Sequence, residues 1–200
     1  MSTSEQLAKS IKLDNRGIHV LLWDNKDDLV RVVIVLMASL DINSIEFLLL
    51  SSVDQSVKEL KGLLELQPSS EKSMILESDS YGMQRESFLI LFLQQATSRA
   101  LGPWLNGWRS SLAKPPGALL IIRNADFVDF QRYTPDLSSF IGPKIYDSSS
   151  MLSMWSRETD KKINPRIPKK IKDILQELPG ALPTIKEIEN WIRHHPPIDP

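Results

Sequence analysis

The chain has 200 residues, of which 42 % are hydrophobic, and its net charge is −1. This length and composition suit one α/β domain with a substantial core and a small appendage, and the balanced charge gives no bulk attraction to nucleic acid or to a membrane surface. The absence of cysteine from the sequence excludes disulfides, thiolate zinc sites and a cysteine nucleophile.

The N-terminal half alternates between predicted strands and predicted helices. Residues 1 to about 16 are expected to form a frayed arm or a short helix, and their polar start has no signal-peptide core. No apolar run reaches the roughly 20 residues needed to span a bilayer, so we expect a cytoplasmic protein. Residues 18–23 predict the first strand, and an acidic turn at 24–28 leads into a helix over 29–40. A second strand at 45–50, a helix from about 54 and a third strand at 73–77 follow.

A long helix is expected from about residue 84, with Phe88, Leu91 and Phe92 on one side. Gly102 and Pro103 should break or kink it. A second helical piece then runs toward residue 115, and its tryptophans, Trp104 and Trp108, are predicted to lie in the core.

The most informative strand is predicted at 119–122, a wholly apolar run that follows Pro-Pro-Gly and ends at Arg123 and Asn124. Such a run is typical of a central strand that is covered on both faces. Its polar end marks the edge where open α/β sheets bind ligands. A short helix that Pro135 stops, a last strand at 144–147 and a helix after 148–150 come next.

Two amphipathic helices close the chain after a hinge at 164–168. The complete pattern predicts a three-layer α/β fold with a mostly parallel sheet, flanking helices and a short C-terminal helical extension. We therefore divide the chain into an N-terminal arm (1–16), an α/β core (17–164) and the extension (165–200).

A nucleotide site is the first function to consider for this layout. A phosphate loop needs glycines that free backbone amides and a lysine for the phosphate charge. The turn at 24–28 has no glycine and three carboxylates, and no phosphate-binding glycine motif occurs elsewhere. This argues against ordinary phosphate-loop ATP hydrolysis. No catalytic residue, metal site or cofactor is expected.

Three polar residues at predicted strand ends are candidates for an unorthodox nucleotide pocket: Asp24, Asp79 and Asn124. Glu77 and Asp79 together suit a magnesium ion, although a solvated strand end and helix cap is the favoured interpretation. Asp24 and Asp79 would share a site only if their strands are neighbours.

The C-terminal helices offer two further surfaces. Ile188 and Trp191 belong to an apolar stripe that suits docking on the sheet domain or on another protein equally well. The basic cluster between Lys161 and Lys172 has no interleaved aromatic residues, so a solvated face is favoured over a nucleic-acid patch.

Two short motifs flank the predicted central strand. Leu105-Asn106-x-x-Arg109 precedes it, and Thr134-Pro135-Asp136-Leu137-Ser138 follows it. In this order, over residues 18–147, they resemble the ATPase-like domain of bacterial STAND-type signalling proteins, here without the Walker A loop. The resemblance implies a degenerate, non-catalytic relative of phosphate-loop ATPases, an α/β core used for assembly, and structural or interface roles for Arg109 and Asp136.

The leading hypothesis is a non-catalytic α/β domain that binds a protein partner in a bacterial signalling or defence assembly. The first alternative is a nucleotide-binding switch or enzyme that uses Asp24, Asp79 and Asn124. The second is an accessory protein of a mobile element that contacts DNA through the Lys161–Lys172 cluster.

Overall fold

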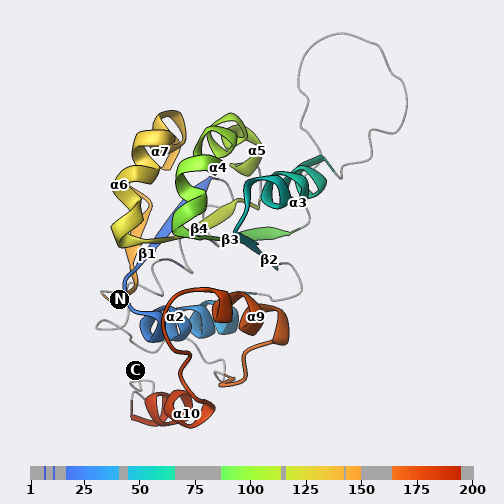
Figure 1. The fold of residues 1–200 in the computed structure, drawn as a ribbon. Helices are drawn as coiled ribbons and strands as arrows, with labels where there is room; N and C mark the ends of the chain where they lie inside the picture. The colour runs from blue at the N-terminus through green and yellow to red at the C-terminus, as the bar shows by residue number, and fades with distance from the viewer. Residues whose placement is uncertain are drawn as a thin grey trace.

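Five parallel strands form the centre of the molecule (Figure 1). The fold is that of a computed structural model, which describes residues 7, 11, 17–40, 45–65, 87–113, 116–141, 143–149 and 164–194. The strands are β1 (Ile18–Trp23), β2 (Ile45–Leu50), β3 (Phe88–Leu93), β4 (Ala118–Arg123) and β5 (Ile145–Asp147). They lie in the order β2-β3-β4-β1-β5.

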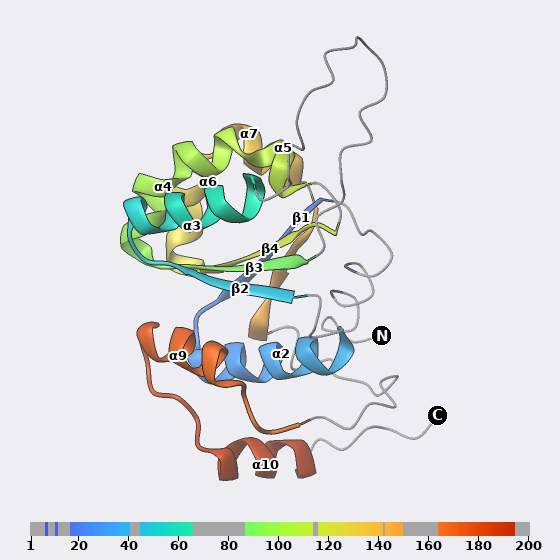
Figure 2. The same ribbon diagram turned by 90° about the vertical axis from the view of Figure 1, so that its right-hand side faces the viewer.

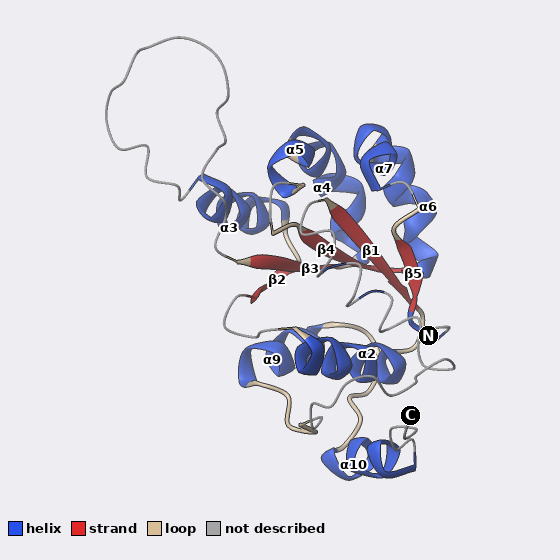
Figure 3. Cartoon of the chain, turned by 180° about the vertical axis from the view of Figure 1, so that it is seen from behind, coloured by secondary structure: helices blue, strands red, loops and turns tan. Residues whose placement is uncertain are grey.

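Helices cover both faces of this sheet, which gives the three-layer α/β fold that the sequence predicts (Figures 2 and 3). One face carries α3 (Val53–Glu65), α4 (Gln95–Gly107), α5 (Arg109–Leu112), α6 (Asn124–Tyr133) and α7 (Pro135–Ile141). The other carries α2 (Lys26–Ser39) and α9 (Lys169–Glu177), and α10 (Ile185–His194) lies beyond them, farther from the sheet.

The position of β4 confirms the prediction of a buried central strand. It pairs with β1 on one side, with Ile18 opposite Ala118, and with β3 on the other. Because successive side chains of a strand point to opposite faces, Leu119 and Ile121 enter the core under α2 and α9, whereas Leu120 enters the core under the other helices. Because both faces of β4 are buried, its sequence is apolar at successive positions and does not alternate with polar residues.

The prediction of a helix from about residue 84 is wrong over residues 88–93, which form β3 between β2 and β4. All six side chains of this strand are buried. Helical spacing of Phe88, Leu91 and Phe92 was therefore a coincidence within a run that is apolar at every position, and the helix begins only at Gln95.

Pro103 and Trp104 differ from the expectation, whereas α6 ends before Pro135 as predicted. Pro103 lies inside α4 and does not break it, because the buried side chains of Leu101 and Leu105 hold the helix on the sheet. Trp104 is not a core residue: it is 48 % exposed, since it lies about 100° around the helix from Leu105. Pro135 ends the linker after α6 and also begins α7.

The C-terminal helices are packed on the sheet domain. Ile171, Ile174 and Leu175 of α9 are buried in the same core as β1, β3 and β4. The strand predicted at 73–77, the helix predicted after residue 150 and the N-terminal arm, apart from the buried Leu7 and Ile11, lie outside the described residues.

Two helical glycines give a matched test of this packing. A Cβ added at Gly102 of α4 would meet the Cβ of Tyr133 at 2.8 Å, whereas one added at Gly62 of α3 meets nothing within 4 Å. We expect Gly102→Ala to lower the free energy of unfolding by about 1–3 kcal/mol through overpacking. Gly62→Ala should raise it by about 1 kcal/mol through helix propensity. Urea titration of both variants checks the opposite signs, and equal effects would contradict the close contact of α4 with the end of α6.

Candidate functional site

The carboxyl ends of β1 and β4 form a crevice at the edge of the sheet. The chain leaves β1 into α2 on one face and leaves β4 into α6 on the opposite face. Adjacent strands whose connections diverge in this way define the place where open α/β sheets bind ligands.

Two of the three residues predicted for this edge are brought together. The Asn124 side-chain amide Nδ2 donates a hydrogen bond to Asp24 Oδ2 at 3.1 Å, which joins the ends of the two neighbouring strands. Both side chains are exposed. Asp79, the third of these residues, lies outside the described residues.

Lys26, the first residue of α2, holds the C-terminal segment (residues 164–194) against this crevice. Its ammonium Nζ donates to the backbone oxygens of Leu178 at 2.6 Å and Gly180 at 2.8 Å. The side chain is only 4 % exposed, and burial lowers the pKa of its ammonium. This lysine belongs to the acidic turn predicted at residues 24–28. Its position could have identified it as a candidate, since a phosphate loop places its lysine at the start of the helix that follows the first strand.

The loop after α9 is shaped to accept this lysine. Gly180 has a φ of +102°, a conformation that glycine adopts without strain. A Cβ at Gly180 would lie 3.2 Å from the Cβ of Lys26, so glycine also permits the close approach. The Gln94 side chain, at the end of β3, donates to the Glu177 backbone oxygen at 3.1 Å. The end of β3 and the first residue of α2 therefore both bind the C-terminal segment.

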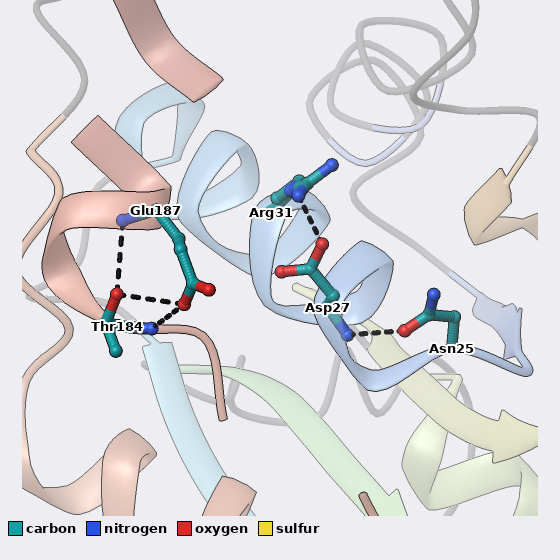
Figure 4. Close-up of polar contacts among 5 residues, drawn as sticks. All are labelled: Asn25, Asp27, Arg31, Thr184 and Glu187. Carbon is teal, nitrogen blue, oxygen red and sulfur yellow. Dashed lines mark hydrogen bonds and ion pairs between the residues drawn. The ribbon is translucent and has the colours of Figure 1, made fainter. Parts of the chain in front are cut away.

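Helix α10 is capped by residues at its own start (Figure 4), and its Trp191 ring lies near Arg31 of α2. Thr184 and Glu187 form a reciprocal capping box, in which Glu187 Oε2 accepts from the Thr184 backbone N–H at 2.6 Å and Thr184 Oγ1 accepts from the Glu187 N–H at 3.3 Å. The backbone and hydroxyl hydrogen bonds from Thr184 lower the pKa of the Glu187 carboxyl. Arg31 of α2 pairs with Asp27, and its guanidinium lies 5.5 Å from the Trp191 ring centre.

Ile188 and Trp191 are therefore used within the chain. They are 1 % and 7 % exposed, and Ile188 belongs to the core beneath the sheet. Of the two alternatives that the sequence leaves open, the structure shows docking on the chain's own domain.

A pocket of about 380 Å³ lies beside the Lys26 contact. Its lining includes Trp23, Gln94 and Arg123 at the strand ends, Asp126 in the first turn of α6, and the loop from Glu177 to Pro179. Asp126 is 5 % exposed, and burial raises the pKa of its carboxyl, with Arg123 opposing the rise. Among the described residues, Asp126 Oδ2 has no hydrogen-bond partner.

Asp126→Asn should stabilise the protein at neutral pH. A carboxyl whose pKa is raised on folding contributes stability below its unfolded pKa and loses it as pH rises through the folded pKa. Removing the charge should therefore raise the free energy of unfolding by about 1 kcal/mol at pH 7, the lower end of the cost of an unsatisfied buried polar group. The gain should shrink toward pH 4. Urea titrations at both pH values test this, with the exposed Asp129→Asn as the control. Destabilisation by Asp126→Asn at pH 7 would contradict it.

The two flanking motifs meet on the opposite side of the sheet. Asn106 Nδ2 donates to Asp136 Oδ2 at 3.0 Å, and the Leu137 backbone N–H donates to Asn106 Oδ1 at 2.9 Å, which caps the first turn of α7. Arg109 donates to the Asn106 backbone oxygen at 2.9 Å and lies 3.9 Å from Asp136 Oδ2. Arg109 and Asp136, to which the resemblance gives structural or interface roles, are thus part of a polar cluster that joins α4 and α5 to α7.

The outer surface of this helical layer is partly apolar. Trp104 of α4, Val128 of α6 and Phe140 of α7 are 48 %, 74 % and 49 % exposed. The Arg109 guanidinium lies 5.9 Å from the centre of the Phe140 ring, and the rings of Trp104 and Trp108 are 5.7 Å apart. We call the exposed surface of α4–α7, with Trp104, Val128 and Phe140, the helical face.

The described residues contain no group of three or more histidine, aspartate or glutamate side chains placed to hold a metal ion. Within the same residues, no helix has the length and apolar character needed to cross a membrane. Of the basic cluster, Lys169, Lys170 and Lys172 lie exposed on α9, with Lys170 bonded to Glu46 at 2.9 Å. Lys161 and Lys162 lie outside the described residues.

Comparison with known proteins gives no family for this chain. No protein-family profile matches the sequence, and no curated protein matches it significantly.

Proposed function

We propose that the chain is a non-catalytic α/β domain that binds a protein partner through its helical face, in a bacterial signalling or defence assembly. The observation that carries this proposal is the exposure of Trp104, Val128 and Phe140 on a layer that the Asn106–Arg109–Asp136 cluster fixes in place. Aromatic and arginine side chains on a rigid surface are the groups that dominate protein–protein binding energy.

The carboxyl ends of the strands lack the features of a phosphate site. The ammonium that would neutralise a phosphate, that of Lys26, is engaged by the backbone oxygens of Leu178 and Gly180. The turn after β1 has no glycine to present free amides. Both features support a domain that does not hydrolyse nucleotides, as the resemblance to a STAND-type domain without a Walker A loop implies.

Site-specific photocrosslinking tests the helical face. p-Benzoylphenylalanine is placed at position 104 or 140 in cells that express the protein natively, and at position 186 of α10, an exposed lysine, as the control. We expect an adduct of one size from positions 104 and 140 and none from position 186. The adduct formed from position 104 should disappear when Phe140→Ala is added. Adducts from position 186 alone, or from none of the three, would contradict the proposal.

A nucleotide-binding switch is the second candidate, and the Asn124–Asp24 hydrogen bond favours it, because it places two polar groups at the topological switch point. A triphosphate there would have to draw Lys26 away from Leu178 and Gly180 and tolerate the Asp24 carboxylate. ATP with magnesium should then stabilise the protein in a saturable way, which the first proposal does not predict.

A further inference from the structure

Two residues that line the pocket beside Lys26 each carry a buried polar atom that lacks a partner among the described residues. The two atoms are the carboxylate oxygen Oδ2 of Asp126 and the indole nitrogen Nε1 of Trp23. These side chains are 5 % and 2 % exposed. One is an acceptor when ionised, and the other is a donor only. Buried polar groups are normally hydrogen-bonded, so two orphans of opposite kind in one pocket point to a ligand that offers both a donor and an acceptor.

The rest of the pocket narrows the chemistry of that ligand. Arg123, at the end of β4, brings a cationic fork suited to a carboxylate. Leu93, Leu178 and Pro179 bring apolar surface. The volume of about 380 Å³ lies within the range of small-molecule sites. A phosphate suits this lining less well, because the carboxylates of Asp126 and Glu177 would repel it.

We propose that the pocket binds a free α-amino acid with an apolar side chain. The ammonium group of the ligand donates to Asp126, the carboxylate accepts from Arg123 and from the Trp23 indole N–H, and the side chain packs on Leu93 and Pro179. This binding role is separate from the helical face, which lies on the other side of the sheet from α2 and α9.

The ligand would also be coupled to the C-terminal segment. Leu178 lines the pocket, and its backbone oxygen accepts a hydrogen bond from Lys26. A ligand that fills the pocket therefore stabilises the loop after α9 in its docked position, because it contacts only the state in which that loop is closed.

The test is calorimetric titration of the full chain with L-leucine and L-phenylalanine up to about 10 mM, a range that detects dissociation constants near 1 mM. Two analogues of leucine remove one charge each: N-acetyl-L-leucine lacks the ammonium, and L-leucinamide lacks the carboxylate. We expect saturable binding of at least one of the two amino acids, and binding of both analogues at least about tenfold weaker, since hydrogen bonds to charged groups are involved.

Matched variants assign the contacts. Asp126→Asn and Trp23→Phe should each weaken binding of the amino acid by about tenfold or more, whereas Asp129→Asn, exposed on the same helix, should leave it unchanged. No saturable binding of either amino acid would overturn the proposal. So would equal affinity for the amino acid and its two analogues, or unchanged affinity in both Asp126→Asn and Trp23→Phe.

Discussion

Leu175→Ala should lower the free energy of unfolding by about 3 kcal/mol. Leu175 lies in the last turn of α9, is 0 % exposed and belongs to the core that β1, β3 and β4 share with α2. Removing a buried leucine side chain costs about 2–5 kcal/mol, because transfer free energy is lost and a cavity remains. Urea unfolding followed by fluorescence and by circular dichroism measures the loss, and both probes should report one transition.

Ile185→Ala is the control for this substitution. Ile185 belongs to α10, in the same C-terminal segment, but its side chain is 53 % exposed. Its replacement should change the free energy of unfolding by no more than about 0.5 kcal/mol. If Leu175→Ala had an effect as small as Ile185→Ala, the C-terminal helices would not be part of the cooperative unit that contains the sheet.

Lys26→Met should lower the free energy of unfolding by about 2–3 kcal/mol and release the loop after α9. Methionine keeps the apolar part of the side chain but leaves the backbone oxygens of Leu178 and Gly180 without the ammonium donor. Hydrogen bonds to charged groups contribute about 1.5–3 kcal/mol each, and the solvent that reaches the exposed Gly180 offsets part of the loss. Urea titration gives the stability, and hydrogen exchange over residues 177–182 reports the release of the loop.

Lys172→Met is the matched control, since Lys172 lies exposed on α9. It should alter neither the stability nor the exchange of the loop. A Lys26→Met variant as stable as the wild type, with unchanged exchange, would mean that the cost of burying the ammonium cancels its two hydrogen bonds and that another contact holds the segment.

The sequence predicts the sheet well where patterns are local. The bounds of β1 and β2 agree with the predictions at 18–23 and 45–50, and 119–122 is the heart of β4. Glycine, proline or a polar cluster bounds each of these runs. The run 88–93 also has polar residues on both sides, but it is apolar at every position, so periodicity alone did not separate a buried strand from a buried helix.

The candidate site was predictable in part. Asp24 and Asn124 were proposed because polar residues follow two predicted strands, and strand pairing brings them into contact. Arg109 and Asp136 were named because the order of two motifs resembles that of a known family. Their contact with each other depends on how α4, α5 and α7 pack. Lys26 was missed because its partner Leu178 lies 152 residues away along the chain. Asp126 was missed because no local pattern shows that its carboxylate is buried without a partner among the described residues.

We propose that the chain's own C-terminal segment engages the Lys26 ammonium and so keeps it from binding a nucleotide phosphate at the carboxyl ends of the strands. Thermal unfolding of the wild-type chain during titration with ATP and magnesium tests it most directly. We predict no saturable rise in Tm. A saturable stabilisation, which would reach about 2.7 kcal/mol at a hundred times the dissociation constant, would contradict the claim and favour a nucleotide-binding switch.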